Sequence, residues 1–519
     1  MSSPASPPMA TAAAPAVAPW RRLSPLMLLV HPIREIGRAV PGLLALLFVG
    51  SGAGHGPLWG LVGAGIVAAV SLSRWFTTRY RVSADQVQIR EGLFRRRTLA
   101  ARLERVRTVD VTSSFLHRAL GLARVEIGTG VSDRKGSSAL RLDGLAADHA
   151  ARLRGELLHR ADATGGTPSL DVPADGLLEP GLPEAEIARL DPAWLRFAPF
   201  TLSGVVTGLA ILGFGWRLVS ETQVDVGTIG PLHSVSAQLS EISLWLAVAE
   251  VAVGAAVFVA LASTVRYVLA FWGFRLTRHR GGSFHVARGL LTTRATSIDV
   301  DRLRGVGISE PLLLRLLGGA RTIAIATGLE VGRGASPAGR GGTVLLPDAP
   351  LAAALRVASV VTGRPDVVDA ALVPHGSAAT GRRYTRALGG ALAVLALTGL
   401  VWWVLGLRGY DWAAGVVLLL GAAPLAADRA RNLGHRVAGG YLVTQSGSLV
   451  RRKAILETDA IIGWNVRQSL FQRRVGVLTL SATTAAGRQF YRILDVTPTE
   501  ARRIADAATP GLLSQFGPS

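Results

Sequence analysis

Cysteine is absent from this 519-residue chain. Without it the chain can have no disulfide framework, no thiolate metal site and no cysteine nucleophile. It also has no zinc-protease, serine-hydrolase or Walker-type signature, and its ten histidines lack the spacing of metal ligands. We therefore expect a protein that is not an enzyme and that uses no cofactor or metal.

Charged residues are also scarce, at 18% of the chain against 49% hydrophobic residues. The balance is nevertheless basic, with a formal net charge of +21 that comes almost entirely from arginine. In a soluble protein this charge would suggest nucleic-acid binding. The arginines gather beside apolar segments, however, as they do in membrane proteins. We expect the partner to be a lipid bilayer, and no nucleic acid.

Residues 39–73 carry no charge at all. A helix of that length would measure roughly 50 Å, far more than the ~30 Å hydrocarbon core of a bilayer. The glycine-rich break at 52–57 therefore predicts two short passes joined by a turn. Two similar pairs of apolar segments follow: 197–219 with 242–262, and 387–407 with 412–427. The sequence predicts six transmembrane helices, arranged as three hairpins.

The distribution of arginine predicts the orientation of these hairpins. Arginines flank both ends of every hairpin, whereas residues 220–240, between two passes, contain Glu221 and Asp225 but no lysine or arginine. By the positive-inside rule, the N-terminus, the C-terminus and the polar segments after the hairpins lie in the cytoplasm. We expect a multi-pass protein of the cell (cytoplasmic) membrane, without a cleavable signal peptide.

A motif recurs after each hairpin, which indicates internal repetition. Two glycines 29 residues apart mark every copy, and an arginine lies three positions before the second glycine. The marker residues are Gly92, Arg118 and Gly121; Gly289, Arg315 and Gly318; and Gly447, Arg473 and Gly476. Such glycines favour positive φ in tight turns. The arginines either contact a ligand or partner, or have a structural role, in which each caps a turn or pairs with a carboxylate such as Glu104, Asp301 or Asp459.

Each copy combines short alternating segments, typical of half-buried strands, with one amphipathic helix at its end. In the first copy the strand pattern begins at 80–82 and the helical pattern covers 146–160. We therefore predict a membrane α + β protein in which each of three transmembrane hairpins is followed by a small domain of antiparallel sheets with a C-terminal helix.

These patterns define the domain boundaries that we expect. They are a disordered tail at 1–19; hairpins with juxtamembrane segments at 20–79, 189–273 and 387–436; small domains at 80–160, 274–362 and 437–510; linkers at 161–188 and 363–386; and a tail at 511–519. The first tail is rich in Ala, Pro and Ser, and the first linker in Gly, Pro and acidic residues, compositions typical of disorder.

The order of these features resembles a known family. Two spans, a glycine turn leading into a basic strand, and an [FL]-L-x-R-x-[LV]-G turn with its following strand succeed one another in the chain. This order is similar to that of the bacterial pleckstrin-homology-like (bPH) membrane proteins of the YdbS/YdbT type. Three units in one chain are like the longer, YdbT-type members.

The resemblance implies a pleckstrin-homology-like (PH-like) fold of two packed antiparallel sheets and a closing helix, tethered to the cytoplasmic membrane. It implies no enzymatic activity and no particular ligand. Copy three departs from the other two at two positions: Ala460 replaces Arg105 and Arg302, and Thr479 replaces Arg124 and Arg321. If those arginines bind a ligand, copy three binds it differently or not at all.

A basic cluster, Arg95, Arg96 and Arg97, follows the Gly92 turn. Arginine matches phosphate through two parallel hydrogen bonds, so the cluster is a candidate contact for anionic lipid. Alternatively it is a basic face attracted to an acidic leaflet without specificity. The second copy has threonines at the corresponding place, which argues against a phosphate site shared by all copies.

Glu250 is the only acid inside an apolar segment. An intramembrane carboxylate is a candidate functional site by default, here for a proton or cation, or else a protonated group hydrogen-bonded between helices.

Two hypotheses follow. In the first, the three cytoplasmic PH-like domains form a scaffold at the membrane surface that binds lipid or protein partners of unknown identity, with a possible oligomer. In the alternative, the six-helix bundle acts as a transporter or channel accessory through Glu250.

Overall fold

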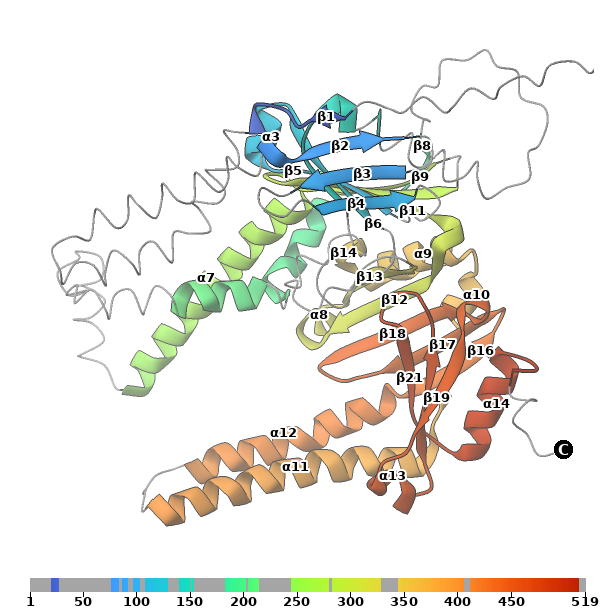
Figure 1. The fold of residues 1–519 in the computed structure, drawn as a ribbon. Coiled ribbons are helices and arrows are strands. Elements are labelled where there is room, and N and C mark those ends of the chain that lie inside the picture. The colour runs from blue at the N-terminus through green and yellow to red at the C-terminus, as the bar shows by residue number, and fades with distance from the viewer. Residues whose placement is uncertain are drawn as a thin grey trace, which may run out of the picture. The chain divides into compact units, whose positions relative to one another are not determined.

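The structure is a computed structural model that describes thirteen stretches of the chain (Figure 1). They are residues 20–27, 76–83, 86–91, 97–102, 108–128, 140–150, 152–153, 183–201, 204–213, 244–279, 282–327, 344–405 and 411–512. The chain divides into two compact units, the first made of residues 1–129 and 137–173, and the second of residues 130–136 and 174–519. Each unit is described by itself.

The first unit contains the first repeat. Its N-terminal sheet has four antiparallel strands in sequence order: β1 (Arg21–Arg22), β2 (Arg79–Val82), β3 (Gln86–Glu91) and β4 (Arg97–Arg102). The antiparallel strands β5 (Thr108–Ser113), β6 (Leu122–Gly128) and β7 (Leu140–Ala146) follow, with the short helix α3 (Phe115–Ala119) after β5. Val87, Val109 and Val125 from these strands belong to one buried cluster, so the repeat has its own core.

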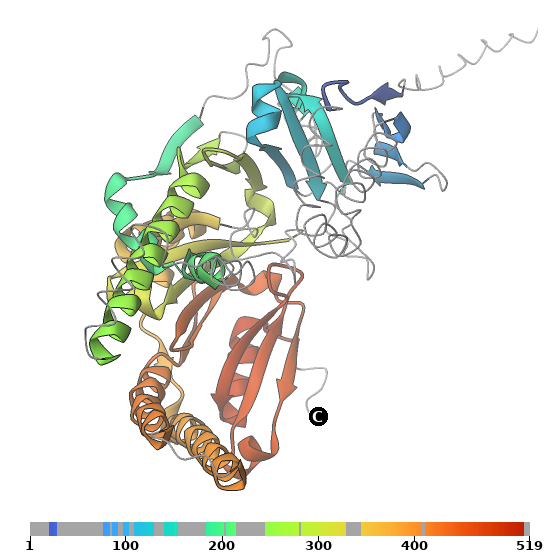
Figure 2. The same ribbon diagram turned by 90° about the vertical axis from the view of Figure 1, so that its left-hand side faces the viewer.

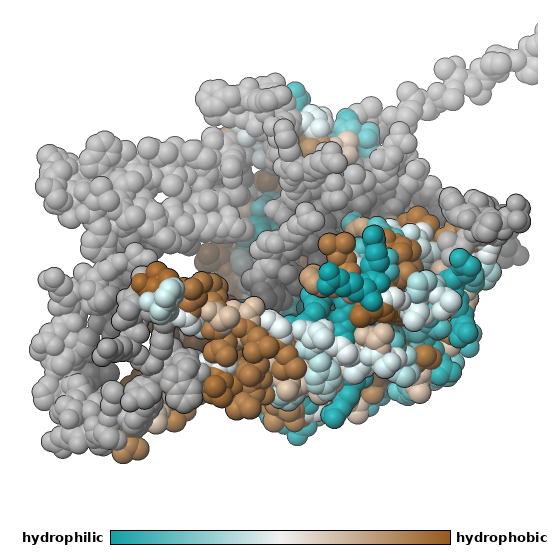
Figure 3. All heavy atoms as spheres, turned by 90° about the horizontal axis from the view of Figure 1, so that it is seen from below, coloured by the Kyte–Doolittle hydropathy of each residue, from teal (hydrophilic) through white to brown (hydrophobic). Residues whose placement is uncertain are grey.

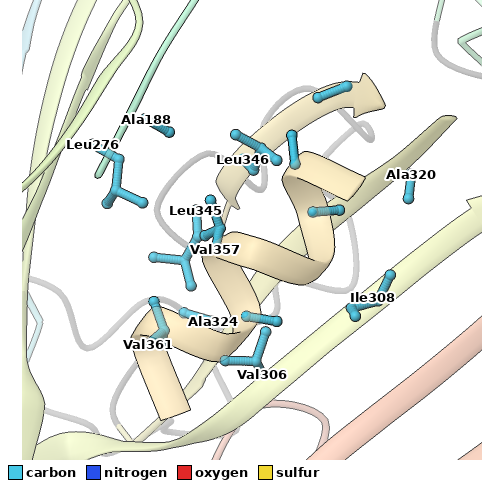
Figure 4. Packing of buried hydrophobic residues seen from close by; sticks show 14 of the residues in the cluster. Ala188, Leu276, Val306, Ile308, Ala320, Ala324, Leu345, Leu346, Val357 and Val361 are labelled. Atoms are coloured by element: carbon cyan, nitrogen blue, oxygen red, sulfur yellow. The ribbon is translucent and has the colours of Figure 1, made fainter. Parts of the chain in front are cut away.

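The second unit begins with the second repeat. Its elements are β8 (Pro183–Arg189), the 3-10 helix η2 (Pro192–Phe200), α7 (Leu244–Phe271), β9 (Arg275–His279), β10 (Ser283–Arg288), β11 (Thr293–Asp299), η4 (Val300–Arg302), β12 (Leu303–Pro311), α8 (Leu312–Leu316), β13 (Gly319–Ala326), β14 (Val344–Pro350) and α9 (Leu351–Thr362). The closing helix α9 lies on β12–β14, and Figure 4 shows its Val357 and Val361 among Leu276, Val306 and Leu345. The predicted closing helix is therefore the lid of a hydrophobic core.

The third repeat completes the second unit. Its elements are α10 (Pro365–Val368), β15 (Val373–Pro374), α11 (Gly376–Leu405), α12 (Asp411–Arg431), β16 (Gly434–Ala438), β17 (Tyr441–Ser446), β18 (Val450–Glu457), η5 (Thr458–Ala460), β19 (Gly463–Arg467), α13 (Leu470–Arg474), β20 (Leu478–Thr483), β21 (Phe490–Val496) and α14 (Pro498–Ala508). Strands β19, β20 and β21 form a three-stranded sheet. Helices α11 and α12 lie side by side as an antiparallel hairpin in both ribbon views (Figures 1 and 2).

The second and third repeats share one sheet. Strand β12 of the second repeat pairs antiparallel with β18 of the third, which gives a seven-stranded sheet in the order β14-β13-β12-β18-β17-β16-β15. Nothing in the sequence pattern predicted this joint.

In each repeat, the first described strand pairs with a strand on the far side of the segment predicted to be a hairpin. Strand β1 pairs with β2, β8 with β9, and β15 with β16, each pair antiparallel. In the third repeat, the α11–α12 hairpin therefore does not simply precede a small domain, as the sequence suggested, but is inserted between the first two strands of a sheet. Helix α7 likewise lies between β8 and β9 in the second repeat, whereas the first predicted hairpin lies outside the described residues. Strand β8 begins within the expected linker at 161–188, and the expected linker at 363–386 contains β15 and the first turns of α11.

The marker glycines adopt the backbone conformations expected of tight turns. Gly121, Gly318 and Gly476 have φ of +65°, +72° and +68°. At Gly447, φ is +108° and a Cβ atom would lie 2.1 Å from the carbonyl oxygen of Val450. Gly289 has the same φ and a similar close approach, whereas Gly92 lies outside the described residues.

Two of the described helices are long and apolar enough to cross a membrane: Ala249–Phe271 in α7 and Gly376–Val401 in α11. Helices Pro192–Phe200 and Gly204–Gly213, bent by 54°, would make a third span if taken together. The prediction of six spans is thus confirmed only in part. Helix α12 contains Pro424 and a charged last turn, which shorten its apolar stretch. Residues 39–73 and 214–243 lie outside the described part of the chain.

Apolar side chains gather on the surface of the α11–α12 hairpin, whereas hydrophilic side chains cover much of the adjoining third repeat (Figure 3). An apolar helical surface next to a polar domain is the division expected at a membrane boundary.

Candidate functional site

A groove of 1220 Å³ lies between the first turns of α11 and the three-stranded sheet β19–β21 of the third repeat. Six arginines line it: Arg382, Arg383, Arg386, Arg467, Arg474 and Arg492. Asp495 is the one carboxylate among the described lining residues, so the formal balance of the groove is +5. A concave surface with this excess of guanidinium groups favours an anionic ligand.

Asp495 holds the membrane helix against the sheet. It is buried, and its carboxylate forms ion pairs with Arg382 and with Arg383, at 2.6 Å from Arg383. The side-chain amide of Gln472 donates a further hydrogen bond to it, of 2.7 Å. A buried carboxylate is costly unless it is paired, so these three partners fix the position of α11 on the third repeat.

In the other two repeats, the corresponding carboxylate pairs with an arginine of the neighbouring strand. In the second repeat, Arg321 donates to Asp348 over 3.0 Å between neighbouring strands, and Arg124 pairs with Asp143 in the first. Thr479 replaces this arginine in the third repeat, and the arginine partners of the carboxylate come from α11 instead. The groove therefore lies where the sequence of copy three departs from the other two.

Four arginines of the groove have no described carboxylate within ion-pair distance. They are Arg386, Arg467, Arg474 and Arg492, and all four are exposed. An unpaired guanidinium offers two parallel N–H donors at the spacing of phosphate or carboxylate oxygens. These four residues are therefore the part of the groove that can bind an anion.

The rim of the groove is apolar. Phe471, on α13, is 71% exposed, and Val475 and Phe490 are also exposed. The equivalent short helices of the other repeats likewise expose Phe115 and Leu313. Large apolar side chains beside arginines are typical of surfaces that contact the membrane interface.

Two histidines and a glutamate lie in a row beside the first residue of α11. The Nδ1 atom of His375 is 2.6 Å from the carbonyl oxygen of Leu494, its Nε2 atom is 3.0 Å from Nδ1 of His435, and Nε2 of His435 is 3.3 Å from Glu500. Burial lowers the pKa of His375 to about 4. Burial also lowers the pKa of His435, against the opposing effect of Glu500. His375 is therefore neutral at pH 7 when it lies between the carbonyl oxygen of Leu494 and the ring of His435.

The arginines that the sequence analysis proposed as site residues lie in different parts of the structure. Of the basic cluster, Arg97 begins β4, whereas Arg95 and Arg96 lie outside the described residues. Arg118 and Arg473 are exposed, on α3 and α13.

Arg315 pairs with a carboxylate, as one of the two interpretations held, but with a different one from those considered. Its guanidinium lies 2.8 Å from Asp428 on α12, and not beside Asp301.

Glu250 is exposed and is the second residue of the span Ala249–Phe271. Helix α7 itself begins at Leu244, so Glu250 lies six residues after the start of the described helix, and its role stays a prediction.

Sequence reasoning missed Arg382, Arg383 and Asp495 as a site. The two arginines were interpreted only as the positive flank of a hairpin, and Asp495 carried no motif. The signal that could have found them was Thr479, because it leaves the carboxylate of copy three without its usual partner.

Comparison with known proteins agrees with this architecture. The family described as Bacterial PH domain matches residues 33–161, 232–362 and 388–510. The chain is similar to the UPF0699 transmembrane protein YdbT of Bacillus subtilis (strain 168), with 20% identity over 268 residues. That match covers 50% of this chain and 52% of the relative, about half of each, and no solved structure matches. The three matches, each ending with a PH-like repeat, show that the chain belongs to the bacterial PH domain family.

Proposed function

We propose that this protein is a non-enzymatic binding protein anchored in the cell membrane, and that the groove of its third repeat binds the anionic headgroup of a membrane lipid. The cytoplasmic side, indicated by the arginine flanks, is the proposed location of the three PH-like domains. Together they form a scaffold at the membrane surface.

The observation that carries this proposal is the set of four unpaired arginines beside the first turns of α11. Three arginines precede the apolar part of this helix, so its beginning belongs at the level of the lipid headgroups. A groove that opens there meets phosphate at high local concentration. The exposed Phe471 at its rim suits the boundary between headgroups and acyl chains.

The chemistry of the groove supports binding rather than catalysis. Its one described carboxylate, Asp495, is occupied by two arginines and a glutamine, which leaves it no role as a general base. Arginine is always protonated and is a poor proton acceptor. The alternative, a transporter or channel accessory that acts through Glu250, stays a prediction.

The test uses the full-length protein in detergent, with phosphatidylglycerol as the anionic probe and phosphatidylcholine as the neutral one. Native mass spectrometry counts the lipids bound to the wild type, to Arg467→Gln/Arg492→Gln, and to the charge-matched control Arg488→Gln/Arg502→Gln. The control arginines are exposed and lie outside the groove. We expect phosphatidylglycerol binding to fall about tenfold in the groove variant only, since each lost contact removes roughly 0.7 kcal/mol. Equal losses in both variants would refute a defined site.

A further inference from the structure

The joint between the second and third repeats is a strand pairing with a defined register. Residues 305–311 of β12 face residues 456–450 of β18, and Ile308 lies opposite Lys453. The ion pair between Arg451 and the buried Glu310 reinforces the joint. One PH-like repeat therefore extends the sheet of the next.

The strand of the third repeat that corresponds to β12 is β19, which lies 158 residues further along the chain. Within the described residues, β19 pairs with β20 and has no strand on its other side. Val466 of β19 is 61% exposed, whereas its counterpart Ile308 is 2% exposed. An open edge with an exposed β-branched residue is a template for another strand.

The strand that could pair with this edge lies in the first repeat. Strand β4 corresponds to β18, 355 residues earlier, and it is the last strand of its described sheet, paired only with β3. Thr98 and Leu99 of β4 are exposed. Among the described strands, one copy thus has a free edge on β19, the counterpart of β12, and a free edge on β4, the counterpart of β18.

We infer that β19 of one copy pairs with β4 of a second copy, in the register of the β12–β18 joint. Val466 then lies opposite Thr98, as Ile308 lies opposite Lys453. Because the two surfaces differ, the contact is head-to-tail and repeats from copy to copy, as a chain or a closed ring. Helix α7 and the α11–α12 hairpin extend from the same side of the sheet that joins the second and third repeats, so a joint of this kind is compatible with both repeats facing one membrane (Figure 1).

The contact between copies is weaker than the joint within a copy. By sequence equivalence, Gln468 takes the place of Glu310, so the reinforcing ion pair is lost. Arg467 and Arg97 take the places of Ser309 and Arg452, which adds a like-charge pair across the contact. Assembly is therefore reversible and responds to protein density in the membrane.

The absence of cysteine allows a clean test on the full-length protein. Two single variants, Thr98→Cys and Val466→Cys, are purified, mixed in detergent or liposomes and treated with a short bismaleimide. We expect covalent dimers only in the mixture, and a ladder of longer species from the double variant. Val360→Cys, on the exposed surface of α9, replaces Val466→Cys in the control mixture and should give no dimer.

Two outcomes overturn the inference. Absence of dimers from the mixture rules out the contact, and dimers from Val466→Cys alone show that β19 pairs with its own copy across a two-fold axis. A second measurement does not depend on cross-linking. Val466→Lys, which charges an already exposed edge position, should reduce assemblies seen by mass photometry to monomers, whereas Val466→Thr should leave them intact. Equal mass distributions for these two variants also contradict the inference.

Discussion

Arg321 in β13 forms a two-point ion pair with Asp348 in β14, with distances of 3.0 Å and 2.5 Å. Thr479 and Asp495 occupy the corresponding places in the third repeat and do not pair with each other. The carboxylate that the strand leaves unpaired is neutralised by a membrane helix. In the second repeat the carboxylate thus links two strands of one sheet. In the third repeat, where threonine replaces the arginine, it links the sheet to helix α11.

Replacing Asp495 with asparagine should destabilise the protein by about 3 kcal/mol, because it leaves two buried guanidinium groups without a carboxylate. Thermal unfolding of the full-length protein measures the loss. Hydrogen exchange should show lost protection in the first turns of α11 and in β21. Asp506→Asn, at an exposed position of α14, is the control and should be neutral. A normal unfolding temperature for Asp495→Asn would mean that the clamp contributes nothing.

Stability should fall as the pH is lowered from about 6.5 to about 4. The folded-state pKa of His375 is about 4, below the ordinary value of 6.5, so the unfolded chain binds more protons throughout this window. Protons therefore favour unfolding, by up to about 3 kcal/mol at the lower end. Urea unfolding at pH 7 and pH 5 measures the slope. His375→Gln should flatten it, and a slope that is the same in this variant would assign the effect to other groups.

Gly447→Ala should cost about 1–3 kcal/mol, since the residue has φ of +108° and a Cβ would collide with the carbonyl oxygen of Val450. Gly421→Ala is the matched control, because it lies in helix α12 with open space around its Cα. There alanine should be neutral or slightly stabilising. Equal unfolding temperatures for the two variants would contradict the strained turn.

Phe471 should lie in the membrane interface. A nitroxide attached to Phe471→Cys in liposomes should collide more often with oxygen than with a polar nickel complex, because oxygen concentrates in lipid. The same label at Val360→Cys, on the surface of α9, should show the reverse. If both labels prefer the nickel complex, the groove faces water and the headgroup proposal loses its basis.

Added salt should change the two proposed interactions in opposite directions. Headgroup binding depends on exposed arginines and should weaken as salt screens their attraction for phosphate. The contact between copies carries a like-charge pair, Arg467 with Arg97, and should strengthen. Counting bound lipids and cross-linked dimers over one salt series tests both. A parallel change in the two quantities would contradict this assignment of charges.

The sequence predicted the features that depend on local pattern. The threefold repeat, the turn conformations at Gly318 and Gly476, and the closing helix α9 all follow from spacing and periodicity. Each is specified by residues close together in the chain. The membership of the PH-like family rests on the same local patterns.

Features that depend on distant partners were not predicted. Strand β15 has two residues and no strand pattern, and its existence depends on its pairing with β16. The β12–β18 joint depends on how two folded repeats meet. Arg382 and Asp495 are 113 residues apart, and only the fold brings them together.

The insertion of the α11–α12 hairpin between the paired strands β15 and β16 has a mechanical consequence. Helix α11 starts two residues after β15 and α12 ends three residues before β16, so both arms are bound to adjacent strands about 4.8 Å apart. The domain cannot swivel on its anchor as it would on a single flexible tether. Any tilt of the α11–α12 hairpin in the bilayer must therefore be followed by the sheet that continues from both of its ends.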